Sequence, residues 1–593
     1  MKKTFEEQLE DIKQKQLILE KQSQTYSIIR ALIFIFLLAS GYFGYIHNKL
    51  FYGLCAILLL VFLYFIKKHD EVKSKITYCK MQQEVVQRYL HRYTNEWKSF
   101  KEDGEIFLNE NFSAGYDLDI FGHASLFQYL NTASTHIGKK QLANWLSSKP
   151  QSDIEVVERQ NAVSECMKKN EFSIHFEVLG RLANHKVDSK RVFESIEAIK
   201  ENDYSNKHMN IIRWILPSIT ILAFVVAYIS KLAIFTTIAK VGIFIQLSLT
   251  LFFSNKIAQT LRPVFALHEA LSIYVKMFES LQEETFTSTY LQKQVKEIHA
   301  SIKGVKALSL VSEMAKVRFN FIAHIIMSAL FLWDFHCVQQ LTKWKQEYLQ
   351  YLPKWFEVLG NIEAICSLSV LAKIKEVYCF PTIRSDVEVS TTQMGHPLLL
   401  ESTTVLNDFY SGATSNVITG SNMSGKTTFL RTLGLNTILA YAGSVVHAQS
   451  FQIGLMNIFT SMRIEDNVSE GISTFYAEIL RIKQMVDFHK SKQPMLALID
   501  EIFKGTNSVD RIMGASEMIR QLTSNNCITC ITTHDYELCD LENDTDVHSK
   551  NYHFSEYYKD SKICFDYKIK QGRATTTNAQ YLLKMVGIIR DDS

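Results

Sequence analysis

The stretch that decides the fold of the C-terminal third is Thr419 to Leu430, TGSNMSGKTTFL. Residues 420–427 have the spacing G-x-x-x-x-G-K-T, between the strand-like run SNVIT and the helical run TTFLRTLGLNTILAYA. In such a loop the glycines let backbone N–H groups turn inward, and the helix N-terminus favours negative charge. The stretch therefore predicts a phosphate-binding loop. Within it, we expect Lys426 to reach the β and γ phosphates of ATP and Thr427 to bind Mg²⁺.

Two further segments supply candidate catalytic residues. In PMLALIDEIFKGT an apolar strand ends at Asp500 and Glu501. An acid at that position can hold Mg²⁺ and the next can polarise the attacking water, so we assign these roles to Asp500 and Glu501. The run CITCITTHD ends a third strand at His534, where the side chain either approaches the γ phosphate or is satisfied by nearby backbone. Position alone leaves both alternatives open.

The pattern around these motifs predicts an α/β domain from residue 381 onward. Proline and glycine punctuate this part of the chain, and short β-rich runs alternate with helical ones. That alternation is typical of a largely parallel sheet covered by helices. Cys527 and Cys530 lie three apart on one predicted strand and point to opposite faces, so we expect ordinary core cysteines there.

Length and composition narrow the remaining possibilities. A chain of 593 residues is too long for one compact core, so several domains are expected. The 64 basic residues nearly balance the 61 acidic ones, so the overall charge gives no nucleic-acid signature. Ten cysteines without a repeated spacing argue against a disulfide framework and favour a reducing compartment.

Two pairs of apolar runs precede the α/β domain. The first pair is ALIFIFLLASGYFGYI (31–46) and LFYGLCAILLLVFLYFI (50–66), and the second lies at 214–229 and 236–253. Each run is near the shortest length of a membrane-spanning helix, about 17 residues. Basic residues flank the first pair and place both of its ends on the cytoplasmic side. We predict two transmembrane hairpins, with a buried helical hairpin as the alternative for the second pair.

The rest of the N-terminal two thirds has helical periodicity. Residues 1–27 read as a charged amphipathic helix that leads into the first apolar run. The run FIAHIIMSALFLW, from Phe321 to Trp333, has only the length of a core helix, and we predict a soluble core helix there.

These segments together resemble the MutS family. The motifs HPLL (from 396), ITGSNMSGKTTFLRT (from 418), LAYAGSVVHA (from 439), EGISTFYAEI (from 470), LIDEIFKGTNSVD (from 498) and TTHDYEL (from 532) occur in the order of the MutS ATPase domain. Upstream, residues 117–163 look like the start of the MutS core and lever region. The resemblance implies an ABC-class, MutS-type P-loop NTPase domain that binds ATP and Mg²⁺.

The resemblance also assigns individual residues. It implies catalytic roles for Lys426, Glu501 and His534, and Mg²⁺ binding by Thr427 and Asp500. It implies that Ser473, with its neighbour Thr474, reaches the nucleotide of the opposite subunit, so the expected assembly is a homodimer. The implied nucleotide-binding residues of the loop are Gly420, Ser421, Asn422, Met423, Ser424, Gly425, Lys426, Thr427 and Thr428.

The chain also departs from the family. A mismatch-reading domain with a Phe-x-Glu wedge is expected to be absent, because Phe5 and Glu7 lie on the charged first helix. No appended nuclease domain is expected after residue 593. The predicted organisation is a cytoplasmic amphipathic helix (1–27), a transmembrane hairpin (28–68), a first helical core and lever part (69–205), a second transmembrane hairpin (206–255), a second core and lever part (256–380) and the ATPase domain (381–593).

Three functional classes follow. The first is a membrane-anchored, dimeric MutS-related ATPase that binds mismatched or branched DNA in DNA repair or maintenance. The second is an ATP-driven membrane mechanoenzyme without DNA, and the third is an ABC-type transporter. The hairpins predict a multi-pass membrane protein in contact with lipid, with its ATPase domain and both termini in the cytoplasm.

Overall fold

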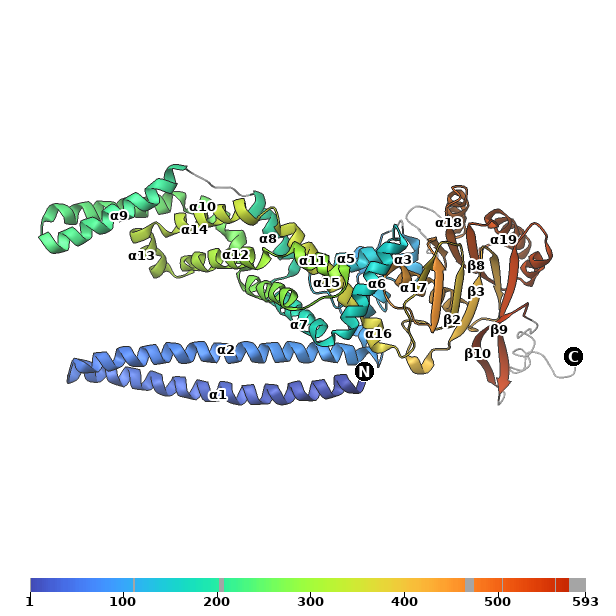
Figure 1. The fold of residues 1–593 in the computed structure, drawn as a ribbon, viewed down its shortest axis with the longest axis horizontal. Helices are drawn as coiled ribbons and strands as arrows, with labels where there is room; N and C mark the ends of the chain where they lie inside the picture. The colour runs from blue at the N-terminus through green and yellow to red at the C-terminus, as the bar shows by residue number, and fades with distance from the viewer. Residues whose placement is uncertain are drawn as a thin grey trace.

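The computed structural model describes residues 2–109, 112–201, 207–463, 474–503, 505–559 and 562–574. The molecule is elongated, with an all-helical region at one end and an α/β region at the other (Figure 1). The helical region extends as two arms in the same direction, away from the α/β region. We call α1 and α2 the first arm, and α8 to α14 the second arm.

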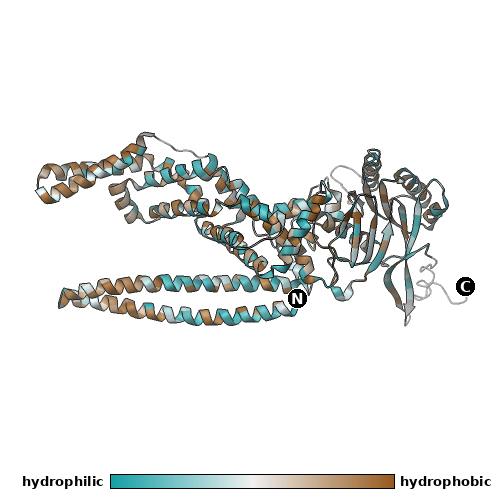
Figure 2. Cartoon of the chain, in the orientation of Figure 1, coloured by the Kyte–Doolittle hydropathy of each residue, from teal (hydrophilic) through white to brown (hydrophobic). Residues whose placement is uncertain are grey.

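The first arm is a hairpin of two long helices, α1 (Lys2–Ile46) and α2 (Leu50–Arg92). At its base the rings of Phe5 and Tyr89 stack with their centroids 4.9 Å apart. Toward the tip, beyond a hydrogen bond of 2.9 Å between the side chains of Ser23 and His69, large apolar side chains of both helices are exposed (Figure 2). Since α1 is continuous, the charged segment 1–27 and the first apolar run belong to one helix.

The second arm is built around α10 (Ala233–Glu283), which follows α9 (Lys207–Ser230) after a tight turn. The two helices approach closely where a Cβ on Gly242 would lie 2.3 Å from Thr220 Oγ1. Gln246 Nε2 donates to the same hydroxyl at 2.9 Å. The other helices of the region are α3 (Ser113–Asp117), α4 (Leu126–Leu130), α5 (His136–Ser147), α6 (Asp153–Lys168), α7 (Asn170–Lys186), α8 (Ser189–Glu201), α11 (Thr289–Glu297), α12 (Ser301–Ala315), α13 (Phe321–Phe331), α14 (Trp333–Tyr348), α15 (Leu352–Leu368) and α16 (Val370–Ile374).

Five helical segments of the described chain are long and apolar enough to cross a membrane, judged by length and composition. Four of them lie in α1, α2, α9 and α10, and at most 22% of each apolar window is buried. The fifth, Leu352–Ile374, is 94% buried and forms the interior of the helical region. Of these five segments, the first four therefore present apolar surface to the outside and the fifth does not.

The prediction of a soluble core helix at Phe321–Trp333 is wrong. The helix α13 forms, but Phe321, Ile322 and Ile326 are exposed, whereas the buried positions are Ser328 and Ala329. A short apolar run specifies a helix without specifying what its large side chains contact.

The C-terminal region has the expected α/β architecture. Among the described residues, six strands form one sheet in the order β10-β9-β4-β8-β7-β6, and four form a second sheet in the order β1-β5-β2-β3. In the larger sheet all pairings are parallel except that of β9 with β10. The strands are β1 (Thr382–Arg384), β2 (Val389–Met394), β3 (Asn407–Ser411), β4 (Ser415–Thr419), β5 (Ser450–Gly454), β6 (Asn457–Ser461), β7 (Met495–Asp500), β8 (Cys527–Thr533), β9 (Ser549–Lys559) and β10 (Lys562–Gln571).

Helices cover both faces of the larger sheet. On one face lies α17 (Lys426–Ala442), and on the other lie α18 (Thr474–His489) and α19 (Ser508–Leu522). Along β7, Leu498 packs on the α17 side and Ile499 on the α19 side, as the two-residue period of a strand requires. Cys530 and Cys527 are likewise buried on opposite faces as free thiols, which confirms the expectation for that pair.

A buried carboxylate joins the helical region to the α/β region. Asp117, at the end of α3, is fully buried and accepts hydrogen bonds from the backbone amides of Met462 and Arg463, at 3.1 and 3.0 Å. Arg481 of α18 donates to the same carboxylate at 3.2 Å. Nearby, Asp119 pairs with Arg431 of α17 at 3.1 Å. The helical region is therefore fixed, through Asp117 and Asp119, to the end of β6 and to the helices α17 and α18 of the α/β region.

Replacing Asp117 with alanine should lower the free energy of unfolding by at least about 2 kcal/mol, because each buried group left unpaired costs about 1–3 kcal/mol. Thermal or urea unfolding of the detergent-solubilised protein measures the change. Asp487→Ala is the matched control, since Asp487 lies on α18 but is exposed and pairs with the exposed Lys490. Equal losses for the two variants would contradict the junction.

Candidate functional site

The predicted site residues meet at one edge of the larger sheet, where β4, β8 and β7 end side by side. Thr419 lies opposite Thr533 in the first pair of strands, and Asp500 lies opposite Thr532 in the second. Because all three strands are parallel, their carboxyl ends face the same side. Sequence segments more than a hundred residues apart are thereby placed next to one another.

The loop between β4 and α17 has a conformation that depends on its glycines. Gly420 has φ +151° and Gly425 has φ +106°, in the region that favours glycine. A Cβ on Gly420 would lie 2.9 Å from Ser424 Oγ and 3.0 Å from the carbonyl oxygen of Phe554. Ser421 Oγ donates to Glu556 at 2.9 Å, which ties the loop to β9. The remaining loop residues, Asn422, Met423 and Thr428, are exposed.

Two polar groups inside the loop suit an anion. The Lys426 side chain is buried, and its Nζ donates to the carbonyl oxygens of Gly420 and Ser421 at 2.7 and 2.9 Å. The Ser424 hydroxyl is buried and is without a hydrogen-bond partner among the described residues. An ammonium and a free donor beside a helix N-terminus form a favourable phosphate environment.

Asp500 lies at the centre of the site. Thr427 Oγ1 donates to its carboxylate at 2.9 Å, and Thr532 Oγ1 donates to it from the neighbouring strand. A hydroxyl from the start of α17 and a carboxylate from β7 therefore lie in direct contact. Oxygen ligands of these two types suit Mg²⁺, which binds proteins through one or two carboxylates together with substrate phosphates.

Glu501 occupies a constrained turn immediately after β7. Its φ is +52°, and its amide donates to the carbonyl oxygen of Thr532 at 3.1 Å. Two residues later, the amide of Phe503 donates to the buried carboxylate of Glu478 on α18. This turn directs the partly exposed Glu501 carboxylate toward His534, whose Nε2 lies 3.2 Å from Oε1.

The loop that carries His534 is held by an ion pair. Arg511 of α19 donates to both oxygens of the adjacent Asp535, at 2.7 and 2.6 Å. These hydrogen bonds raise the pKa of Arg511 above its ordinary value. A bidentate pair restricts orientation as well as position. The motif TTHDYEL contains Asp535, but nothing in the sequence around Arg511 indicates that the two residues pair.

Comparisons with known proteins agree with this arrangement. The family model described as MutS domain V matches residues 416–589. The chain is related to MutS. It is 29% identical over 260 residues to the DNA mismatch repair protein MutS of Chloroflexus aurantiacus and 28% identical over 266 residues to that of Clostridium botulinum. These matches cover 42% and 43% of the chain, but only 26% and 28% of the relatives' lengths.

A cavity of about 360 Å³ adjoins the loop between β4 and α17 of this MutS-related chain. The sequence did not predict it, because the motif residues in its lining meet residues such as Asn407 and Tyr567, which lie in segments without a motif. Asn407 closes it by donating to the carbonyl oxygen of Tyr567 at 3.0 Å and accepting from the amide of Ile569 at 2.9 Å. The lining residues are Met394, His396, Leu399, Thr403, Thr404, Val405, Asn407, Gly425, Thr428, Phe429, Thr432, Phe554 and Tyr567.

Burial fixes the protonation of the histidine in this cavity. It lowers the pKa of His396 to about 3, so the ring is neutral at physiological pH. Its Nδ1 accepts from the amide of Leu398 at 3.2 Å. The cavity therefore has mainly apolar walls with neutral polar groups, a composition typical of small-molecule pockets.

The predicted trans-acting residue, Ser473, lies outside the described residues. In the described part of the MutS-related chain, no group of three or more His, Cys, Asp or Glu side chains could hold a metal ion by itself. The site therefore offers a metal one carboxylate and one hydroxyl, and leaves the other positions to water and substrate.

Proposed function

We propose that this chain is a Mg²⁺-dependent ATPase of the P-loop class, anchored in a membrane by its two helical hairpins. The observation that supports the chemistry is the convergence of Lys426, the Thr427–Asp500 pair and the Glu501–His534 pair at one sheet edge. Lys426 and the amides of residues 420–428 would bind the phosphates of ATP. Thr427 and Asp500 would hold Mg²⁺, which supplies positive charge against the phosphate oxygens.

Glu501 is the group placed to polarise water. Its turn is fixed by the hydrogen bond that the Glu501 amide donates to the carbonyl oxygen of Thr532, so the carboxylate is positioned without help from substrate. His534 is within hydrogen-bond distance of that carboxylate and would orient it or the water. General-base assistance of this kind contributes about 10²–10⁴-fold to a rate.

The cavity beside the loop is suited to the nucleoside. It adjoins the loop at Gly425 and Thr428 and offers the aromatic side chains of Phe429 and Tyr567. A base bound there would leave its phosphates on the loop. This geometry supports ATP as one ligand that occupies both cavity and loop.

The relationship to MutS suggests a homodimer that binds DNA, since the relatives from Chloroflexus aurantiacus and Clostridium botulinum are DNA mismatch repair proteins. We propose mismatched or branched DNA as the ligand and DNA repair or maintenance as the process. Ser473 of one subunit would contribute to the nucleotide site of the other. The ATPase domain and both termini would lie in the cytoplasm.

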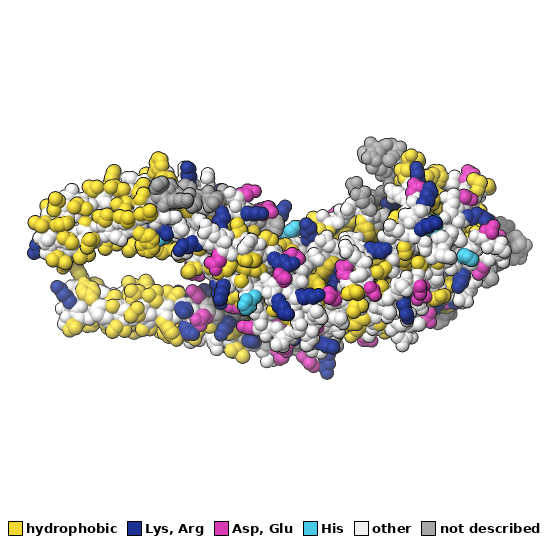
Figure 3. Space-filling model, turned by 45° about the horizontal axis from the view of Figure 1, so that its top comes forward, with side chains coloured by type: hydrophobic (Ala, Val, Ile, Leu, Met, Phe, Trp, Pro, Cys, Tyr) yellow, Lys and Arg dark blue, Asp and Glu magenta, His cyan; other side chains and the backbone are white. Residues whose placement is uncertain are grey.

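A rival function is favoured by the arms themselves. Both end in exposed apolar side chains and extend in the same direction (Figures 2 and 3). In a membrane mechanoenzyme, closure of the dimer on ATP would move the hairpins in lipid without any DNA. The Asp117 junction between arms and site serves either function equally well.

The first prediction for this function concerns the catalytic carboxylate. Glu501→Gln should retain ATP binding but lower turnover by about 10²-fold or more, since the general base is lost. Lys426→Ala should lose both binding and turnover. Phosphate release and a fluorescent ATP analogue measure the two quantities, with the exposed Glu517→Gln on α19 as the control. Parental turnover in either site variant would refute the assignment.

DNA binding separates the first function from its rival. Detergent-purified protein should bind mismatched or branched DNA with an affinity that falls steeply as salt rises, because phosphate contacts release counterions. Fluorescence anisotropy at several salt concentrations measures this dependence. If homoduplex, mismatched and branched DNA all fail to bind at low salt, the proposal of a DNA ligand is contradicted. The membrane mechanoenzyme is then the favoured function.

Membrane topology is tested at the hairpin turns. Cysteines introduced at Asn48 and Lys231 should react with an impermeant maleimide from outside intact cells, whereas one at Val509 in α19 should not. The background replaces the partly exposed Cys55, Cys379 and Cys564 with serine. Reaction at Asn48 and Lys231 only after lysis would show that the hairpins do not cross the membrane.

A further inference from the structure

The helix α13 presents its large apolar side chains outward. Phe321 and Ile322 are 76% and 69% exposed, and Ile326 is 51% exposed. The side that faces the protein carries the small residues Ser328 and Ala329. A helix of a water-soluble domain has the opposite arrangement. The outer face of α13 therefore requires an apolar environment outside the chain.

The helix lies across one end of the α12–α14 pair, where the α9–α10 hairpin begins to project beyond the rest of the second arm (Figure 1). It is bent by 110° from the segment that precedes it, Thr289–Phe319. Leu332, in the left-handed region at φ +48°, ends α13 and starts α14, which runs back toward the α/β region (Figure 1). As a result α13 forms a cap over the α12–α14 pair, roughly perpendicular to the segment that leads to it.

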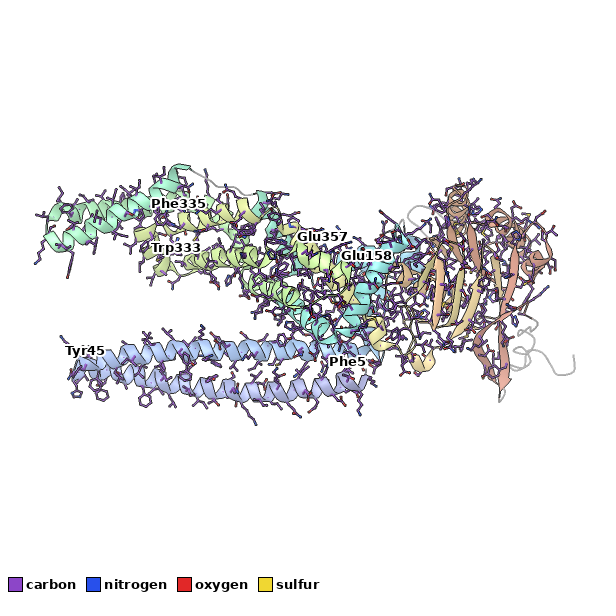
Figure 4. All side chains as sticks on the ribbon, viewed as in Figure 1. Phe5, Tyr45, Glu158, Trp333, Phe335 and Glu357 are labelled. Carbon is purple, nitrogen blue, oxygen red and sulfur yellow. The ribbon has the colours of Figure 1, made fainter. Side chains whose placement is uncertain are left out.

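Side-chain contacts place this cap at the boundary of the apolar runs in α9 and α10. Arg318, just before α13, lies 3.4 Å from Ser254 Oγ, which follows the apolar run of α10. Beyond α13, the ring of His336 lies 4.8 Å from that of Trp214, where the run of α9 begins. Figure 4 shows Trp333 and Phe335 in this part of the second arm, short of its tip. The cap and the start of the hairpin's apolar surface are therefore continuous.

Polar groups beneath α13 hold it in this orientation. Asp334 is fully buried and pairs with His324 Nε2 at 3.1 Å and with Arg318 Nη1 at 3.4 Å. Trp333 Nε1 donates to the carbonyl oxygen of Met314 at 2.8 Å. The ionic contacts lie on the inner side of α13, and its large apolar side chains lie on the outer side. These contacts therefore hold the helix with its apolar side exposed.

The charge around α13 suits an anionic lipid surface. From Met314 to Trp333 the sequence contains no acidic residue, and the exposed Lys316 precedes the helix, whereas Arg318 is turned toward the buried Asp334. Across the boundary, Lys256 of α10 is also exposed. Basic residues beside an apolar face favour the head groups of the cytoplasmic leaflet.

We propose that α13 is a third membrane contact, lying in the head-group layer on the side of the ATPase domain while α9 and α10 cross the bilayer. The proposal rests on the membrane anchoring proposed above and adds an in-plane anchor to it. Its occupant is lipid, because the exposed face continues the apolar surface of the α9–α10 hairpin and is flanked by basic residues. The side chains of Phe321, Ile322 and Ile326 would enter the layer to a depth of about 5–10 Å.

Depth-dependent quenching tests the proposal on the full chain. The protein is reconstituted in vesicles of phosphatidylcholine and phosphatidylglycerol, with an environment-sensitive fluorophore on a cysteine at Ile322 or, independently, at Ile326. Lipids carrying a doxyl group near the head group or deep in the acyl chain serve as quenchers. Matched positions are Phe244, exposed in the middle of the apolar run of α10, and Val509, exposed in α19.

The expected result is stronger quenching at Ile322 and Ile326 by the shallow doxyl group, stronger quenching at Phe244 by the deep one, and none at Val509. Quenching at Phe244 without quenching on α13 would overturn the inference and leave the hairpin anchor intact. Quenching on α13 mainly by the deep group would overturn its in-plane position. Absence of quenching at Ile322, Ile326 and Phe244 would contradict the proposed membrane anchoring itself.

Discussion

The carboxylate of Asp500 joins the elements on which the candidate site depends. It accepts from Thr427 at the start of α17 and from Thr532 on β8, so it connects the loop, the helix and two strands. These contacts require that β4, β8 and β7 run parallel and in the register observed, since Asp500 lies directly opposite Thr532. A shift of one residue in β7 would turn this side chain to the other face of the sheet. The register of buried strands thus determines the position of a polar site.

The motifs predicted the strands, the loop and the helix at this edge of the sheet, because each motif is local. A glycine loop after a strand, and an acid at the end of an apolar run, are specified by neighbouring residues and by strand period. The cavity beside the loop was missed because Asn407 and Tyr567 are 160 residues apart and meet only through pairing of backbone and side-chain groups. Likewise, nothing local indicates that Arg511 would pair with Asp535.

The helical region shows a different limit of sequence interpretation. Length and composition located the long apolar helices, but they gave the same description to Leu352–Ile374, which is interior, and to α2, which is exposed. For α13 they predicted burial in a core, whereas its large apolar side chains are exposed, because the length of an apolar helix of 11 residues does not determine which side chains are buried. The deciding facts are the bend before Phe321 and the buried charge of Asp334, and both arise from tertiary contacts.

The ionic junction at Asp117 connects the candidate site to the helical region. Asp117 accepts from the amides of Met462 and Arg463 at the end of β6, and Arg481 on α18 pairs with the same carboxylate. The same α18 supplies Glu478, which fixes the turn that carries Glu501. A displacement of α18 would therefore alter both the turn that carries Glu501 and the contacts of Asp117. The helix α10 is continuous over 51 residues, so its backbone leads from the interior of the helical region to the tip of the second arm without a loop.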